Sequence, residues 1–236
     1  MGFSNFHRSF LAYQPDSHYF YGAHPEFNDL YARFIQGNLL NNSGDIPRLW
    51  SILLNCKQVV EEGIPGDFAE LGVWRGNTAA ILSVVARGSG RQVFLFDTFE
   101  GFQDRDLKGI DSDKKMEFRD TSTDLVLMTI GEPHGHCHLV KGYFPNSVED
   151  AHRNNFYAVV SLDCDLYEPM KAGLDFFYAR MPKGATFLLH DYSSLYWKGA
   201  KLAIDEFCAA SGEFLVLIPD KSGSAFIRKT KAPQPS

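Results

Sequence analysis

The feature that most constrains this chain is a regular alternation of short apolar runs with segments of helical periodicity, starting at Asp67. Such alternation is typical of βα units, in which each helix returns the chain to the same edge of a parallel sheet. The last two apolar runs are separated by only four residues, 220–223, and this short turn predicts an antiparallel hairpin. The sequence therefore predicts an α/β fold with a mainly parallel sheet. The predicted strands lie at residues 67–71, 92–97, 136–140, 157–163, 185–190, 214–219 and 224–229, and the predicted helices at 45–63, 78–86, 124–130, 170–178 and 200–209.

The N-terminal region differs from the rest of the chain because it is rich in aromatic residues. Ten phenylalanines and tyrosines lie between residues 3 and 34. Because so many apolar rings are not stable in water, we expect residues 1–45 to form an arm or lid that packs on the domain or on a partner subunit. This need favours a homodimer or a higher homo-oligomer. Residues 46–230 are expected to form the catalytic domain, and residues 231–236 a disordered tail.

Composition excludes several classes of partner. The net charge is -6 and the pI is about 5.7, so the chain has no overall basic field that would attract a nucleic acid. No apolar run approaches the length of a membrane span. The four cysteines form no CxxC pair, which suits a reducing compartment. We therefore expect a cytoplasmic protein with a small-molecule ligand and with neither a nucleic acid nor a membrane as partner.

A glycine-bearing turn follows the first predicted strand. Glu70 ends the strand, and Gly72 and Gly76 lie in the turn that enters the next helix. Free backbone N–H groups at such a helix start bind nucleotide-like ligands. A dinucleotide fingerprint would need glycines where Trp74 and Asn77 stand, so the turn disfavours NAD. A ligand without a pyrophosphate, such as S-adenosylmethionine, needs only the two glycines, so the turn is compatible with it.

Two further strand ends supply candidate contacts for this cofactor. Asp97 ends the second strand, about 25 residues after Gly72, where a carboxylate accepts hydrogen bonds from both ribose hydroxyls. The alternative is that Asp97 caps the turn that follows it, and Glu100 would then be the substitute. Gly142 and Tyr143 end the third strand, where they would line an adenine pocket or simply form a turn.

Acidic residues follow the fourth and fifth predicted strands. Asp163 and Asp165 end the fourth strand, and His190 and Asp191 end the fifth. A divalent cation such as Mg²⁺ would relieve the repulsion between these acids. The alternative is that Asp165 and Asp191 cap the helices that follow. His190 suits Zn²⁺ or Mn²⁺ better than Mg²⁺, and it is also a candidate general base.

Two other segments attract attention. Residues 101–120 are dense in charges and glycine and are too long for an ordinary connection, so they form either a mobile lid over a site or a solvated surface loop. Residues 134–138 hold three histidines and a cysteine, but they alternate along a strand start and lack a paired motif, which favours a structural or surface role over a metal site.

Together these motifs resemble the macrocin-type sugar O-methyltransferases, which are class I S-adenosylmethionine-dependent enzymes. The resemblance rests on GDFAELGVWRGNTA, DTFEGF, KGYFPNS, LDCDLY and HDY in this order, and it runs from about Ile46 to Lys229. It implies a Rossmann-like seven-stranded sheet with helices on both faces and a C-terminal antiparallel hairpin. It also implies methyl transfer to a hydroxyl group of a small molecule, such as a sugar of a natural product, with Mg²⁺ or another divalent cation.

The resemblance assigns roles by position. It makes Asp163 a metal ligand and the suspected base, and it places the other two metal ligands at His190 and Asp191, both of which the family fills with acids. Because His190 departs from that pattern, two alternatives stay open, namely a metal-independent methyltransferase and a cofactor-binding protein without turnover. The expected catalytic residues are Asp163 and His190, and the expected cofactor-binding set is Glu70, Gly72, Val73, Trp74, Gly76, Asn77, Thr78, Asp97, Thr98, Gly142, Tyr143 and Asp163.

Overall fold

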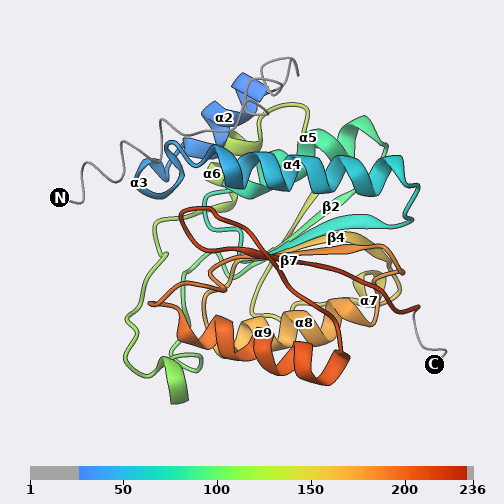
Figure 1. Cartoon of the computed structure of the whole chain (residues 1–236). Helices are drawn as coiled ribbons and strands as arrows, with labels where there is room; N and C mark the ends of the chain where they lie inside the picture. The colour runs from blue at the N-terminus through green and yellow to red at the C-terminus, as the bar shows by residue number, and fades with distance from the viewer. Residues whose placement is uncertain (1–26, 233–236) are drawn as a thin grey trace, which may run out of the picture.

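The computed structural model describes residues 27–232, whose strands form one seven-stranded sheet (Figure 1). The strand order is β3-β2-β1-β4-β5-β7-β6, with β1 to β5 parallel and β7 antiparallel to both of its neighbours. This confirms the predicted α/β fold with its terminal hairpin. The strands are β1 (Asp67–Leu71), β2 (Val93–Asp97), β3 (Cys137–Lys141), β4 (Tyr157–Leu162), β5 (Thr186–Leu189), β6 (Val216–Leu217) and β7 (Ala225–Arg228).

Helices cover both faces of the sheet, as the resemblance implies. One face carries α4 and α5, and the opposite face carries α8 and α9 (Figure 1). None of the helices in residues 27–232 is long and apolar enough to cross a membrane. The helices are α2 (Phe27–Ile35), α3 (Leu39–Asn42), α4 (Ile46–Glu61), α5 (Asn77–Gly88), η2 (Gly109–Asp111), α6 (Thr123–Ile130), α7 (Asp150–Arg153), α8 (Tyr167–Tyr178) and α9 (Lys198–Ser211).

Local signals explain where α4 begins and what it buries. Asp45 accepts a hydrogen bond from the backbone N–H of Arg48 at 3.4 Å, and Pro47 lies in the first turn, where no intrahelical N–H bond is needed. Leu49 and Leu53 are fully buried on the face that packs against the sheet. The predicted helix over residues 45–63 is therefore confirmed.

The predicted extent of the first hairpin strand is wrong. The apolar run 214–219 contributes only Val216 and Leu217 to β6, because only these two residues pair with β7. Phe214 is 82% exposed, so its hydrophobic character does not reflect burial in this structure. The apolar run at this sheet edge therefore predicted a longer strand than the structure contains.

Part of the predicted N-terminal arm lies in the described region. Leu30 and Phe34 of α2 are fully buried in the same core as α4 and α5. Residues 1–26 and 233–236, which hold the rest of the arm and most of the tail, lie outside the described residues.

The strand order decides where a ligand binds. β1 pairs with β2 on one side and with β4 on the other, so the chain turns in opposite directions after β1 and after β4. In open α/β sheets a crevice forms outside the carboxyl ends of the strands at such a reversal. The loops that follow β1, β2, β4 and β5 therefore meet there.

Candidate functional site

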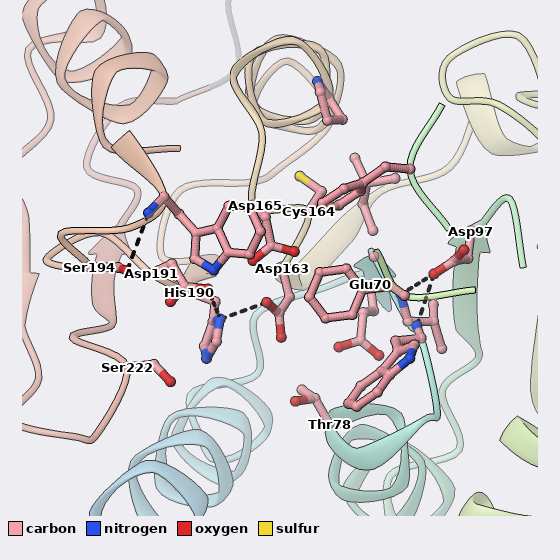
Figure 2. Close-up of a pocket in the computed structure, with 18 of the residues that line it drawn as sticks. Glu70, Thr78, Asp97, Asp163, Cys164, Asp165, His190, Asp191, Ser194 and Ser222 are labelled. Atoms are coloured by element: carbon pink, nitrogen blue, oxygen red, sulfur yellow. Dashed lines mark hydrogen bonds and ion pairs between the residues drawn. The ribbon is translucent and has the colours of Figure 1, made fainter. Parts of the chain in front are cut away.

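A cavity of about 760 Å³ lies at this crevice, and Figure 2 shows its main side chains. The loops after β1, β2 and β3 line one part of it, and those after β4 and β5 line another. Every residue predicted for the site contributes to its lining except Gly76, which is the N-cap of α5. The structure therefore brings together the residues that the motifs singled out.

The two glycines of the first turn are required for different reasons. Gly72 has φ +85°, and a Cβ atom there would lie 2.1 Å from the carbonyl oxygen of Asp163. Gly76 has φ +82° at the N-cap of α5, where a Cβ atom would lie 3.1 Å from Cγ1 of Val126. Gly72 thus permits the close approach of β4, and Gly76 allows the turn into α5.

Asp97 binds the backbone of two loops. Its Oδ2 accepts the N–H groups of Val73 at 2.7 Å and Trp74 at 2.9 Å (Figure 2). Its Oδ1 accepts the N–H of Phe99 at 2.7 Å. The capping alternative is therefore confirmed. Because the carboxylate also lines the cavity, the ribose contact stays a prediction.

Glu70 presents a buried carboxyl group to the cavity. It is 1% exposed, its Oε1 accepts a hydrogen bond from Ser161 at 3.3 Å, and its Oε2 has no partner among the described residues. Burial, with a smaller contribution from the charge of Asp163, raises its pKa well above the ordinary value. A cationic donor in the cavity would satisfy this oxygen and favour its ionised form.

Four titratable side chains from two adjacent strand ends form the centre of the site. Asp163, Asp165, His190 and Asp191 offer ligand atoms that all lie within 4.8 Å of one another. Nδ1 of His190 is 2.6 Å from Oδ1 of Asp163 and 2.5 Å from Oδ2 of Asp191. Asp165 therefore joins the three metal ligands that the resemblance implies.

The capping alternatives for Asp165 and Asp191 are wrong. The N-cap of α8 is Leu166, and the first free N–H of that helix binds Asp111; α9 starts after Trp197. Both acids instead have φ +58°, in the left-handed region that non-glycine residues rarely adopt. Such backbone strain is typical of functional sites, and here it accompanies the clustering of both carboxylates.

The electrostatics of this cluster are unbalanced. Burial first, and then the charges of Asp191 and Asp163, raise the pKa of Asp165 well above its usual range. Burial opposes ionisation of Asp163 too, but the cations of His190 and Arg48 outweigh it and lower its pKa. Burial disfavours the imidazolium of His190, but Asp163 and Asp191 raise its pKa to about 9.

This donor set fits a divalent cation. Three carboxylates crowd around one imidazole and one guanidinium, and burial together with their mutual repulsion raises the pKa of Asp165, a repulsion that a cation would relieve. Carboxylate oxygens suit Mg²⁺ and Mn²⁺, and the imidazole shifts the preference toward Mn²⁺ or Zn²⁺.

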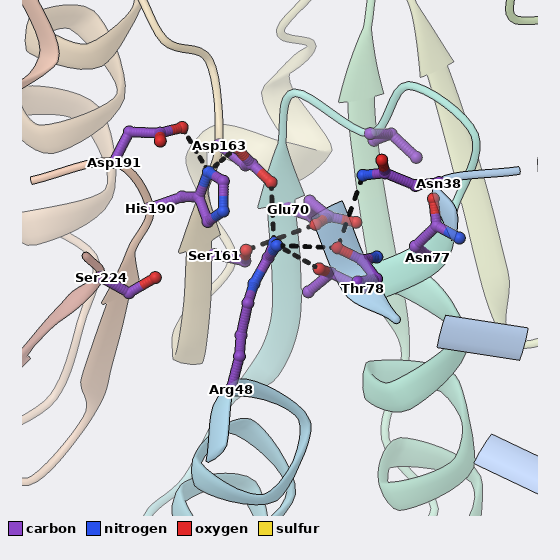
Figure 3. Close-up of polar contacts among 12 residues, drawn as sticks. Asn38, Arg48, Glu70, Asn77, Thr78, Ser161, Asp163, His190, Asp191 and Ser224 are labelled. Atoms are coloured by element: carbon purple, nitrogen blue, oxygen red, sulfur yellow. Dashed lines mark hydrogen bonds and ion pairs between the residues drawn. The ribbon is translucent and has the colours of Figure 1, made fainter. Parts of the chain in front are cut away.

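Arg48 is the residue that sequence reasoning missed. It lies at 6% exposure in the first turn of α4, and its Nη2 is 3.2 Å from Oδ2 of Asp163 and 3.5 Å from Oγ1 of Thr78 (Figure 3). Nη1 donates to Oδ1 of Asn42 at 3.3 Å. A signal was available, because Arg48 shares an i, i+4 stripe with apolar Ile52 on the buried helix face.

Part of segment 101–120 forms an aromatic wall of the cavity, while about half of its residues are exposed to solvent. Phe102 and Phe118 lie 5.1 Å apart between ring centroids, and Phe102 contacts Trp197 at 5.7 Å. Buried Asp111 accepts the N–H of Tyr167 at 2.7 Å and holds the segment to α8. The lid function itself stays a prediction.

The histidine-rich segment 134–138 forms no metal cluster in the described part of the chain. His136 contacts Oγ of Ser83 at 3.0 Å, and His138 contacts Oε1 of Gln92 at 2.8 Å. These two contacts are typical of a structural or surface role.

Comparison with known proteins agrees with these observations. The sequence model of the macrocin-O-methyltransferase family matches residues 47–214. The chain is 27% identical over 63% of its length to the 8-demethyl-8-(2,3-dimethoxy-alpha-L-rhamnosyl)-tetracenomycin-C 4'-O-methyltransferase of Streptomyces olivaceus. It is 26% identical over 70% of its length to the demethyldecarbamoylnovobiocin O-methyltransferase of Streptomyces niveus. These matches span 61% and 66% of the two relatives.

Solved structures show the same architecture. The O-methyltransferase NovP superposes with a TM-score of 0.68 at 25% identity, covering 79% of this chain and 81% of NovP. The calicheamicin methyltransferase CalS11 gives a TM-score of 0.63 at 21% identity, covering 86% of this chain and 93% of CalS11. The seven-stranded sheet with its terminal antiparallel pair is thus a methyltransferase fold.

Proposed function

Since the chain belongs to the macrocin O-methyltransferase family, we propose that it transfers a methyl group from S-adenosylmethionine to a hydroxyl group on the sugar of a natural product. One observation carries this proposal. A single cavity joins the glycine turn, Glu70 and Asp97 to the cluster around Asp163. O-methylation requires a cofactor site beside a group that accepts the proton of the acceptor hydroxyl, and a cation there would assist the reaction.

Different residues of the cavity have different roles in the proposed reaction. When bound, S-adenosylmethionine supplies the electrophilic methyl group, and a divalent cation on Asp163, Asp165, His190 and Asp191 lowers the pKa of the acceptor hydroxyl. Glu70 binds the ammonium of the methionine half, and the turn at Gly72 and Gly76 presents backbone N–H groups. The aromatic wall excludes water from the reacting atoms.

Asp163 is the proposed proton acceptor. Without a cation, Asp163 and Asp191 favour the protonated form of His190, and with a cation the imidazole would be one of its ligands, so in neither state is His190 a free base. The acceptor hydroxyl gives its proton to Asp163, its oxygen forms the bond to the methyl carbon, and the carbon–sulfur bond breaks. The products are a methyl ether and S-adenosylhomocysteine.

A metal-independent reaction is the second candidate. Nδ1 of His190 lies between Asp163 and Asp191, and both carboxylates favour a proton on this imidazole. A cation must therefore displace that proton to bind, whereas the imidazolium itself would orient Asp163 without a metal. Turnover after chelation and dialysis, with and without added Mn²⁺ or Mg²⁺, separates the two candidates.

The test of the function is product formation. The two relatives' acceptors, the rhamnosylated tetracenomycin and demethyldecarbamoylnovobiocin, serve as probes with S-adenosylmethionine, and mass spectrometry detects the added methyl group. Calorimetric titration with S-adenosylhomocysteine measures cofactor binding separately. Binding without methylation of these or other glycosylated acceptors would favour a protein without turnover, and absence of binding would refute the cofactor assignment. A cytoplasmic homodimer, predicted above, is tested by fractionation and sedimentation.

A further inference from the structure

Arg48 occupies a position that is unfavourable for a cation. It lies in the first turn of α4, where the helix dipole is positive, and its side chain is buried. Its ion-pair partner within the described residues is Asp163, which lies 115 positions later in the sequence. Burial and the helix dipole both disfavour a cation at this position, so a specific contact must compensate for these two unfavourable terms.

The contacts of Arg48 leave it little freedom. One nitrogen of the planar guanidinium faces Asp163 and another faces Oδ1 of Asn42. The amide nitrogen of Asn42 in turn donates to the carbonyl of Phe34 at 2.6 Å. The guanidinium carbon also lies 5.5 Å from the centroid of the Phe34 ring. The side chain is therefore held by α2 and α3 while it reaches the end of β4.

The two carboxylate oxygens of Asp163 have different partners. Oδ2 faces Arg48, and Oδ1 faces His190 in the cluster (Figure 3). We propose that Arg48 is a positioning residue, which fixes the rotation of the Asp163 carboxylate so that Oδ1 is presented to the reacting centre. This inference rests on the proposed function, because it concerns the proton acceptor named there.

The role predicts a specific kinetic signature. Without Arg48 the carboxylate rotates toward other partners, and a small misplacement of a reacting group reduces the rate of the chemical step. The cofactor contacts expected at Glu70, Gly72 and Asp97 are not hydrogen-bonded to Arg48, and Thr78 accepts a hydrogen bond from its Nη2 only at 3.5 Å. We therefore expect Arg48→Met to lower kcat by about tenfold or more, with the affinity for S-adenosylhomocysteine changed by no more than about threefold.

The experiment compares three variants at saturating cofactor. Arg48→Met removes the guanidinium, and Arg48→Lys keeps a positive charge but lacks the two donor nitrogens of the planar guanidinium. Arg33→Met is the control, because Arg33 of α2 contacts Asp29 and the carbonyl of Ile130 instead. We expect partial recovery of kcat in Arg48→Lys and an unchanged kcat in Arg33→Met. Binding stoichiometry for S-adenosylhomocysteine shows what fraction of each variant is folded, so a merely structural loss is recognised.

Two results would overturn the inference. One is a kcat of Arg48→Met within twofold of the parent, and the other is a large loss of cofactor affinity with kcat intact, which would make Arg48 a cofactor ligand. A readout without turnover comes from thermal unfolding of Asp163→Asn with and without Arg48→Met. Asp163→Asn leaves Arg48 without its charged partner, whereas the contacts of Arg48 with Asn42 and Phe34 remain. Arg48→Met is therefore expected to lower the melting temperature less in the Asp163→Asn background than in the parent, and equal losses in the two backgrounds would contradict the contact. This comparison remains decisive for the contact even when no acceptor is methylated, whereas failure of the parent enzyme alone would count against the proposed function.

Discussion

Gly72 has no Cβ atom, and this allows the ends of β1 and β4 to approach each other at the site. A methyl group there would meet the Asp163 carbonyl at 2.1 Å, and the backbone φ is positive. We predict that Gly72→Ala destabilises the protein by about 3 kcal/mol or more, because both the clash and the backbone strain must be accommodated. Gly90→Ala is the control, since Gly90 has φ +70° but no neighbour within 4 Å. Equal losses in denaturant unfolding would contradict the steric argument.

Glu70 links stability to pH through its buried carboxyl group. Its pKa is raised in the folded state, so the unfolded chain ionises first and stability falls as pH rises above the ordinary glutamate value near 4.5. Glu70→Gln does not titrate, and we predict that its unfolding free energy improves relative to the parent between pH 4 and neutrality. The affinity for S-adenosylmethionine should fall by about tenfold or more, because a charge-assisted contact is lost. Exposed Glu61→Gln serves as the control, and a pH-independent difference would refute the assignment.

At the scale of elements, segment 101–120 depends on Asp111 for its position. This carboxylate accepts the N–H of Tyr167 and lies against Gly199, so it joins the segment to the starts of α8 and α9. We predict that Asp111→Ala lowers the free energy of unfolding by about 1–3 kcal/mol. It should also make segment 101–120 susceptible to trypsin at its lysines and arginines. Exposed Asp113→Ala should leave both properties unchanged. Unaltered cleavage in Asp111→Ala would show that the aromatic contacts alone hold the segment.

For the whole molecule, ligand binding at the crevice should stabilise the entire domain. The cavity is lined by residues from both halves of the sheet, so a bound molecule contacts elements that unfolding must separate. We predict that S-adenosylhomocysteine at 100 times its Kd raises the unfolding free energy by about 2.7 kcal/mol. Methylthioadenosine, which lacks the amino and carboxyl groups, should bind more weakly because it cannot satisfy Glu70. Equal affinities of the two ligands in calorimetry would contradict the role of Glu70.

Much of the fold followed from periodicity and turn chemistry, which are local properties. The βα alternation predicted the parallel sheet, and Asp45 with Pro47 marked the start of α4. The order of motifs also placed Glu70, Asp97 and Asp163 at strand ends, because the carboxyl ends of parallel strands share one edge. The apolar run 214–219 gave a wrong strand length, because apolar residues at a sheet edge need not pair with the neighbouring strand.

What the sequence by itself determined is which chemical groups stand at the ends of the strands, because strand–helix alternation places them at one edge wherever the chain folds in this way. Only the tertiary structure decided how those groups pair. It directed Asp97 to the amides of Val73 and Trp74, placed Nδ1 of His190 between Asp163 and Asp191, and brought Arg48 to Asp163 across 115 residues. The reason is physical: local patterns record backbone preference and burial, whereas the partner of a buried charge depends on which distant segments the packed core brings within a few ångströms.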